Sequence, residues 1–396
     1  MNDFKMNLPS DVLFILEKIR ENGYSAHVVG GSVRDSLIGR ELGDFDITTS
    51  ATPEVTKEIF KEHKTVDTGI KHGTVTLVLC GIPYEITTYR VDGDYKDSRH
   101  PERVSFTADL SEDLARRDFT VNAMAYSDVD GLVDPFSGRT DTERKIIRAV
   151  GDPYVRFSED ALRILRALRF ASVLGFEIEE RTAQAVKDLS SSLVNISKER
   201  IWTELKKLIM GQNVCFVLET YASVFEVVLS GLNIRCMPKK EDFDGADFYT
   251  RLACLFLLNC ADPASDSERI LTELKTDKLT RTHTFSVLSS YNTASFSDTR
   301  AALVTLMENG KEITEGVLSL GILTRRFSHE DEKALRAALA SGIPYRISAL
   351  DVRGGDLAAL GIKGECVGQT LELLLHAVVD GKVENEKNAL IRYIEK

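Results

Sequence analysis

A pair of glycines, followed thirteen residues later by the first of two aspartates, constrains this chain more than any other feature. The run from His27 to Thr49 is H-V-V-G-G-S-V-R-D-S-L-I-G-R-E-L-G-D-F-D-I-T-T. Its apolar start predicts a short strand over 26–29, residues 32–38 predict a helix, and Gly39 is placed to end that helix. Glycines at a helix start let backbone N–H groups approach an anion closely, and the helix dipole favours negative charge there.

The two aspartates after this turn predict a metal site. The segment Asp44-Phe45-Asp46-Ile47-Thr48 alternates between polar and apolar residues, and residues two apart on a strand point to the same face. Asp44 and Asp46 are therefore expected to share one face. Paired carboxylates suit Mg²⁺, which needs oxygen ligands and commonly bridges to substrate phosphates. Either motif alone is usually a plain turn or a solvated strand edge, but together they predict phosphoryl or nucleotidyl transfer.

Length and composition are those of a soluble globular protein with room for two or three domains. The chain has 396 residues, of which 43% are hydrophobic and 28% charged, and such a length allows more than one core. No apolar run reaches membrane-spanning length, and the first residues carry no signal pattern. The six cysteines form no C-x-x-C pair, so neither a zinc site nor a disulfide framework is indicated. We expect a cytoplasmic protein that uses no membrane.

The net charge of −11 argues weakly against a protein that binds nucleic acid. A local patch matters more than the total, however. Residues 144–210 hold thirteen Lys and Arg against nine Asp and Glu, an excess of four positive charges. The sequence therefore allows a basic strip on an acidic protein, and it leaves the oligomeric state open.

The distribution of strand and helix patterns predicts an α+β head followed by an elongated all-helical arm. Strands are expected at 26–29, 45–48, 74–79 and 84–89, with residues 81–83 as the turn between the last two. Strand patterns fade after about residue 141, and helices are expected at 158–174, 180–189, 198–209, 246–259 and 368–380. We place domain boundaries at 1–143 for the head, 144–210 for a helical neck, and 211–396 for a body and tail.

Two arginines and an aspartate, Arg116-Arg117-Asp118, precede an apolar stretch that predicts a helix. Arginine side chains bind phosphates through two parallel hydrogen bonds. Asp118 could accept a hydrogen bond from a ribose hydroxyl, and it could equally cap the expected helix. The alternative for the whole segment is a capped helix with a solvated basic pair.

A stretch of the first neck helix places four charged residues in register. Ser158 is a good N-cap with acidic residues after it, and leucines at 162, 165 and 168 form one apolar ridge. The charged residues fall every three positions on a neighbouring face, where they are expected to meet a ligand: Asp160, Arg163, Arg166 and Arg169. The alternative is an exposed stripe with an ordinary ion pair.

Three glutamates could have either a catalytic or a structural role. Glu85 points outward from an otherwise apolar strand and is either a third catalytic carboxylate beside Asp44 and Asp46 or a solvent-facing residue. Glu199 and Glu204 flank the single tryptophan, Trp202, in the segment E-R-I-W-T-E-L. For these two we expect a structural role in bracing neighbouring helices.

Taken in order, these segments resemble the bacterial tRNA nucleotidyltransferases known as CCA-adding enzymes and their relatives, the bacterial poly(A) polymerases. The matching pieces are G-G-S-V-R-D, D-F-D, R-R-D-F-T-V-N-A, E-D-A-L-R-I-L-R and E-R-I-W-T-E-L. The glycine-rich stretch over 354–374 resembles the tail of CCA-adding enzymes of the Gram-positive type. Lys363-Gly364-Glu365 departs from it, because the family often has proline-containing turns there.

The resemblance implies a polymerase β-like head with a mixed sheet, then a helical neck, body and tail. It implies template-independent addition of C, C and A to the tRNA 3′ end from CTP and ATP. By the same resemblance, Gly31 and Arg34 contact the nucleotide, Asp44 and Asp46 hold Mg²⁺, and Arg117 contacts triphosphate or ribose. Asp160, Arg163, Arg166 and Arg169 would line the nucleotide pocket. Poly(A) polymerases, enzymes adding only CC or only A, and a non-catalytic RNA-binding protein are the alternatives.

Two further predictions concern the choice of nucleotide. Cytosine and adenine both present an amino donor beside a ring-nitrogen acceptor, which a carboxylate at Asp160 next to a guanidinium at Arg163 would complement. Residues 91–102 are polar and contain Gly and Pro, and we expect a mobile loop that helps the pocket accept adenine after two cytidines. Relatives that add only CC have a shortened loop here, so the resemblance implies CCA rather than CC as the product of a chain with the full-length loop. The alternative is a passive surface connection.

Overall fold

The structure is a computed structural model that describes residues 4–93 and 104–395. Most of the predicted loop over 91–102 therefore lies outside the described residues. Internal contacts divide the chain into two units, Met1–Gly231 and Leu232–Lys396. The predicted boundaries at 143 and 210 both fall inside the first unit and stay a prediction. No helix among the described residues combines the length and apolar character needed to cross a membrane.

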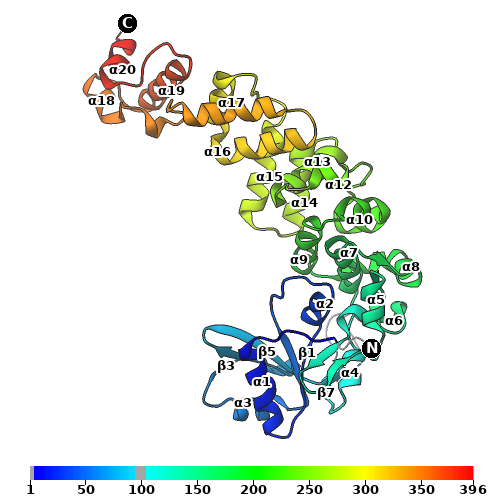
Figure 1. The fold of residues 1–396 in the computed structure, drawn as a ribbon. Helices are drawn as coiled ribbons and strands as arrows, with labels where there is room; N and C mark the ends of the chain where they lie inside the picture. Colours follow the sequence, from blue (N-terminus) through cyan, green and yellow to red (C-terminus); the bar gives the residue numbers. More distant parts are fainter. Residues whose placement is uncertain (1–3, 94–103, 396) are drawn as a thin grey trace. The chain divides into compact units, whose positions relative to one another are not determined.

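The first unit opens with a seven-stranded sheet (Figure 1). From edge to edge its strands are β3 (Lys64–Gly69), β4 (Thr74–Leu79), β5 (Ile82–Thr88), β2 (Asp46–Thr49), β1 (Ala26–Val29), β8 (Ala125–Ser127) and β9 (Gly131–Val133). β2 and β5 run parallel, and the other neighbours are antiparallel. The expected mixed sheet is confirmed.

One face of this sheet is buried under helices, which determines where the aspartates point. α1 (Ser10–Glu21) and α3 (Pro53–Ile59) lie against it (Figure 1), and the buried core includes Ile15 of α1 together with Ile47 and Ile86 of the strands. Because side chains alternate along a strand, Asp46 and Thr48 are turned to the opposite face. That face is the one available to a ligand.

Local geometry corrects several of the predicted boundaries in the head. The hairpin turn is Cys80-Gly81, with φ of 48° and 84°, not 81–83, because two positive φ angles match the twist of the flanking strands. Ile82 already pairs with Leu79. β2 begins at Asp46, so Asp44 lies just before the strand. The sequence patterns also missed β3, β8, β9 and the short pair β6 (Arg90–Asp92) and β7 (Val104–Phe106).

The helix predicted after Asp118 is wrong. Residues Thr120–Asn122 form one 3-10 turn, and the apolar stretch continues into strand β8. Its alanine, methionine and valine residues are buried in the sheet region rather than along a helix face. Three short helices complete the head: α2 (Gly31–Leu37), α4 (Leu110–Ala115) and α5 (Gly138–Glu143).

The helix predicted over 158–174 is in fact two helices, α6 (Pro153–Glu159) and α7 (Leu162–Leu174). Asp152 caps α6 by accepting from the Tyr154 N–H, whereas Ser158 lies inside α6 and donates to the Tyr154 carbonyl at 2.8 Å. Asp160 stands between the helices with extended backbone angles, φ −143° and ψ 103°. The predicted four-residue stripe is therefore a stripe of three arginines with Asp160 at its start.

The remainder of the first unit follows the predicted helices closely. α8 (Glu180–Asp188) and α9 (Lys198–Ile209) match them within one residue, and α10 (Val214–Thr220) and α11 (Ala222–Val228) follow. α9 packs along α7. One exception to the all-helical prediction is a two-residue parallel pair, β10 (Ile146–Ile147) and β11 (Glu177–Ile178).

The regular elements of the second unit are all helices among its described residues. It contains α12 (Lys240–Phe243), α13 (Phe248–Asn259), α14 (Pro263–Glu273), α15 (Lys278–Ser290), α16 (Thr299–Leu323), α17 (His329–Ala340), α18 (Gly354–Ala359), α19 (Glu365–Val379) and α20 (Lys387–Ile394). α13 and α19 correspond to the predicted helices at 246–259 and 368–380. α16 is kinked at Gly310, where φ is 73°, and a separate apolar core includes Leu357, Leu374 and Leu390.

Candidate active site

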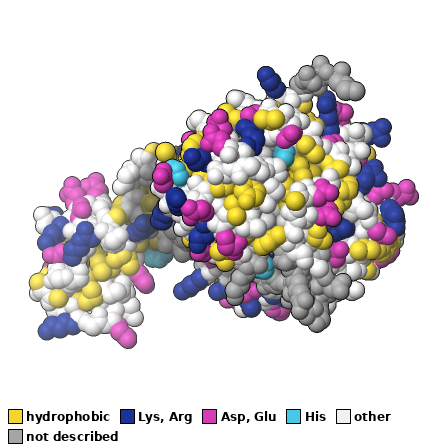
Figure 2. Space-filling view, turned by 90° about the horizontal axis from the view of Figure 1, so that it is seen from below, with side chains coloured by type: hydrophobic (Ala, Val, Ile, Leu, Met, Phe, Trp, Pro, Cys, Tyr) yellow, Lys and Arg dark blue, Asp and Glu magenta, His cyan; other side chains and the backbone are white. Residues whose placement is uncertain are grey.

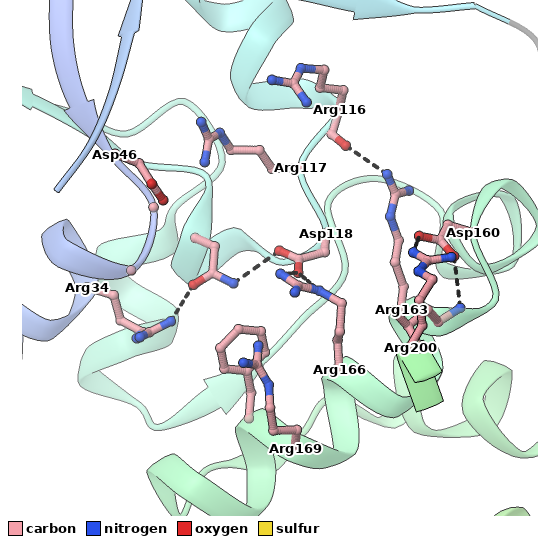
Figure 3. Close-up of a pocket in the computed structure, with 15 residues that line it drawn as sticks. Arg34, Asp46, Arg116, Arg117, Asp118, Asp160, Arg163, Arg166, Arg169 and Arg200 are labelled. Carbon is pink, nitrogen blue, oxygen red and sulfur yellow. Dashed lines mark hydrogen bonds and ion pairs between the residues drawn. The ribbon is translucent and has the colours of Figure 1, made fainter. Parts of the chain in front are cut away.

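A cavity of about 510 Å³ in the first unit brings the predicted motifs together (Figure 3). It is lined by Gly30, Gly31, Arg34, Asp46, Arg116, Arg117, Asp118, Asn122, Asp160, Leu162, Arg163, Arg166, Arg169, Phe170 and Arg200. Seven arginines against three aspartates leave an excess of four positive charges along the wall of this cavity. Such a cavity attracts a polyanion, because partly buried charges are poorly screened. On the surface drawn in Figure 2, by contrast, basic and acidic side chains are interspersed.

The double glycine keeps one wall of the cavity open. Gly30 has φ 76° and stands before the first residue of α2, a conformation that glycine adopts without strain. A Cβ atom at Gly30 would lie 3.1 Å from Nη1 of Arg117, and one at Gly31 would lie 3.5 Å from Nη2 of Arg34. Side chains here would therefore occupy the space that the arginines face. α2 ends at Leu37, with Ile38 as its C-cap, and the predicted glycine follows in the left-handed conformation: Gly39 has φ 68° and donates to the Ser36 carbonyl.

Of the two predicted metal ligands, Asp46 lines the cavity and Asp44 lies close beside it. Burial among surrounding atoms raises the pKa of Asp46, although the side chain reaches solvent; Arg117 opposes this effect, and the negative charge of Asp44 adds to it. No hydrogen bond or ion pair joins either carboxylate to another described residue. Among the described residues, no group of three or more acidic, His or Cys side chains could hold a metal ion.

Glu85 lies on the same face of the sheet as Asp46 but not in the cavity wall. The parallel pairing of Ile47 with Ile86 places Glu85 next to Asp46 on the neighbouring strand. Its side chain is exposed, and it is not among the residues that line the cavity. Its catalytic role stays a prediction.

A fully buried carboxylate, Asp113, holds the arginine pair in place. It lies on α4 and accepts from Arg116 at 2.7 Å, while its second oxygen is 3.5 Å from Nη2 of Arg117. The same oxygen accepts from the Thr48 hydroxyl at 3.2 Å, two residues beyond Asp46 on β2. Burial lowers the pKa of Arg117, and the charge of Asp113 raises it. The sequence interpretation missed Asp113, although its helical spacing of three and four residues from the arginines was a usable signal.

Asp118 joins the head to α7. It accepts from the side chain of Asn122 at 3.0 Å and from Nε of Arg166 at 2.8 Å. Burial raises the pKa of Asp118, but Arg166 and Asn122 outweigh it and hold that pKa at about 2. Asn122 in turn accepts from Arg34. Asp118 caps no long helix here, and its predicted contact with a ribose stays a prediction.

The arginines of α7 all face the cavity, each with its own anchor. Arg169 lies over the ring of Phe170, 3.9 Å from its centroid, and is ion-paired with Glu204 of α9 at 2.9 Å. Glu204 therefore connects α9 to α7, consistent with the bracing role expected of it. Burial lowers the pKa of Arg169 to about 10, although the charge of Glu204 raises it.

Asp160 and Arg163 share the cavity wall but have different partners (Figure 3). Asp160 accepts from Arg200 at 2.7 Å. Arg163 donates to the Glu159 carboxylate at 2.6 Å and to the Arg116 carbonyl at 3.0 Å. Arg200 was not among the predicted site residues, although it lies in the segment that also holds Trp202 and Glu204.

Comparison with known proteins places this site in a family. A family model described as "Poly A polymerase head domain" matches residues 26–148, and one described as "Probable RNA and SrmB- binding site of polymerase A" matches 175–219. A third, "tRNA nucleotidyltransferase domain 2 putative", matches 250–394. A CCA-adding enzyme of Ligilactobacillus salivarius is 37% identical over 402 residues, covering all of this chain and 97% of that protein.

This chain belongs to the CCA-adding enzymes.

Other members support the assignment over the full length. A CCA-adding enzyme of Bacillus pumilus is 36% identical, covering 98% of each chain. The crystal structure of the Bacillus stearothermophilus CCA-adding enzyme in complex with CTP is similar with a TM-score of 0.81 and 32% identity, again covering 98% of both chains. The recognition of the family from the sequence motifs and the expected fold class, a polymerase β-like head followed by helices, are both confirmed.

Proposed function

We propose that this chain adds C, C and A to the 3′ end of tRNA from CTP and ATP, without a nucleic-acid template, and releases pyrophosphate. The observation that carries the proposal is the single cavity in which the glycine turn, Asp46, the arginine pair and the α7 arginines meet. Its excess of positive charge suits a nucleoside triphosphate. Relatives named as CCA-adding enzymes match over nearly the whole chain.

Mg²⁺ is the metal that we propose for this site. Asp44 and Asp46 fit it because they offer two neighbouring carboxylates that no described side chain pairs with. Two protein ligands are enough, since Mg²⁺ usually takes its other ligands from water and substrate phosphates. When bound, the ion would lower the pKa of the tRNA 3′-hydroxyl and stabilise charge on the α-phosphate. Glu85, on the adjacent strand, would be a third catalytic carboxylate on the same face of the sheet.

The chain's own residues would orient the nucleotide. Gly31 and Arg34 line the cavity next to Arg117, so the triphosphate is expected there, close to Asp46. Asp118 would meet the ribose. The base would lie by α7, where Asp160 can accept from its amino group and Arg163 can donate to its ring nitrogen; Arg166 and Arg169 complete that wall. Uracil and guanine present the reverse order of donor and acceptor.

The tRNA is expected to contact helical parts of the chain through shape and phosphate charge. A poly(A) polymerase would share the head, but the third family model and the full-length relatives favour CCA addition. We expect the enzyme to act in the cytoplasm, where tRNA, CTP and ATP are present. Enzymes that add only CC or only A differ in the product, which the experiment below distinguishes.

The test is incubation of the purified protein with tRNA lacking its 3′ end, CTP, ATP and Mg²⁺, read on a sequencing gel. Products longer by C, C and A are expected. Asp46→Ala should lower the rate on the order of a thousandfold or more, because charge stabilisation at the α-phosphate is lost, while tRNA binding should persist. A run of adenosines, or near-wild-type turnover by Asp46→Ala, would contradict the proposal.

A further inference from the structure

We propose that Arg200 is a positioning residue for base selection: it holds the carboxylate of Asp160 in the orientation that accepts from the amino group of cytosine or adenine. This inference rests on the proposed function. Arg200 extends from α9 to the cavity wall, where its Nη2 lies 2.7 Å from Oδ2 and its Nη1 3.3 Å from Oδ1 of Asp160. Figure 3 shows the two side chains together at one side of the cavity.

Asp160 needs such an anchor because it lies outside regular structure. It stands between α6 and α7 with extended backbone angles, φ −143° and ψ 103°. Its Oδ1 accepts from the Leu162 N–H at 3.0 Å and from Arg200, and its Oδ2 accepts from Arg200 alone among the described residues. A carboxylate has about four acceptor positions, so the remaining position lies on Oδ2.

This arrangement explains how one acceptor can reject the wrong bases. An ionised carboxylate accepts hydrogen bonds and cannot donate them. Held by a planar guanidinium fork, its free position is fixed in direction and suits an amino group but not a carbonyl oxygen. The side chains of Arg200 and Asp160 are 25% and 16% exposed, so water competes only weakly for the contact.

Arg163 does not depend on Arg200. It is anchored by the Glu159 carboxylate and by the Arg116 carbonyl. Loss of Arg200 should therefore release Asp160 while Arg163 keeps its place. The expected defect is in the choice among bases, with the triphosphate and metal sites unchanged.

The test compares Arg200→Met and Arg200→Lys with wild type in the full chain. Single additions to tRNA are followed with CTP, ATP, UTP and GTP, giving kcat and KM for each. Arg200→Met should reduce the preference for CTP over UTP on the order of tenfold or more, as expected for a lost polar pairing. Arg200→Lys should restore little of it, because an ammonium cannot form the fork. Arg181→Met, which breaks an exposed pair with Asp152 at 2.8 Å, is the matched control and should keep the preference.

The outcomes separate this inference from the proposed function. If wild type fails to add C, C and A, the proposed function falls, whatever the variants do. If wild type adds them and Arg200→Met keeps the full preference, Arg200 does not position Asp160. An equal loss of kcat/KM with all four triphosphates would also overturn the inference, because it would indicate that Arg200 has a general structural role. Should Arg200→Met fail to fold, as judged by circular dichroism, the preference of folded Arg200→Lys decides in the same way.

Discussion

The buried carboxylate of Asp113 should contribute more to the stability of the first unit than any exposed ion pair. It has no exposed side-chain area, accepts twice from Arg116, at 2.9 and 2.7 Å, and lies 3.5 Å from Arg117. Asp113→Ala removes this charge from beside Arg116 and Arg117. The Thr48 hydroxyl loses one of its two acceptors and keeps the Thr87 carbonyl at 3.1 Å. Breaking a buried pair by deleting one member costs about 3–5 kcal/mol.

The single tryptophan makes this measurable. Trp202 lies on α9 in the first unit, so its fluorescence during urea unfolding reports on that unit. We expect Asp113→Ala to lower the free energy of unfolding by about 3–5 kcal/mol at neutral pH. The free energy of unfolding of Asp113→Asn should lie between those of wild type and Asp113→Ala, because the amide oxygen still accepts hydrogen bonds but the charge is lost.

Asp109→Ala is the matched control on the same short helix. Asp109 is the exposed N-cap of α4 and accepts from the Ser111 N–H at 2.7 Å, so its loss should cost about 1 kcal/mol. If Asp113→Ala is no more destabilising than Asp109→Ala, the reasoning from burial is wrong. A drop in kcat/KM should accompany Asp113→Ala, because the arginine pair then loses its fixed orientation.

Three other perturbations have expected outcomes. Although burial raises the pKa of Asp118, Arg166 and Asn122 hold it at about 2, below the 3.8 usual for an aspartate, so its ionised form stabilises the fold above about pH 4 and this contribution is lost as the pH falls toward 2. In urea titrations over that range, the free energy of unfolding of Asp118→Asn should fall by about 2 kcal/mol less than that of wild type. Gly30→Ala should weaken CTP binding, measured by calorimetry, because φ is 76° and the added Cβ would lie 3.1 Å from Arg117; unchanged affinity would contradict the proposed phosphate turn. Replacing residues 93–101 with a short Gly/Ser link should spare the two C additions and impair the A step, measured as single-nucleotide additions; equal loss of both steps, or an intact A step, would dismiss the predicted switch.

The local signals around the first motif were enough to predict its structure. β1 was predicted with its observed bounds, both ends of α2 were predicted within one residue, and Gly39 follows that helix with a positive φ. Glycine conformation and apolar alternation act over a few residues, so they can be read without knowing the fold. The same holds for α9, whose apolar spacing and length were sufficient.

Signals that depend on distant partners were not readable in this way. The periodicity over 158–174 looks continuous, yet the helix is interrupted at Asp160. Its carboxylate accepts from the Leu162 N–H and from Arg200, forty residues away. The apolar stretch after Asp118 has helical composition but pairs in the sheet as β8. In both cases tertiary contacts outweigh weak local propensity.

The sequence by itself determined which chemical groups this protein carries and in what order: the glycine turn, the two aspartates and the arginine-rich segments. Only the tertiary structure decided which of them share one cavity and which acid holds which arginine. Asp118 with Arg166 and Asp160 with Arg200 are ion pairs of this kind. Their strength depends on burial and on distances of a few ångströms, and for the pairs that join separate segments the packing of those segments sets both.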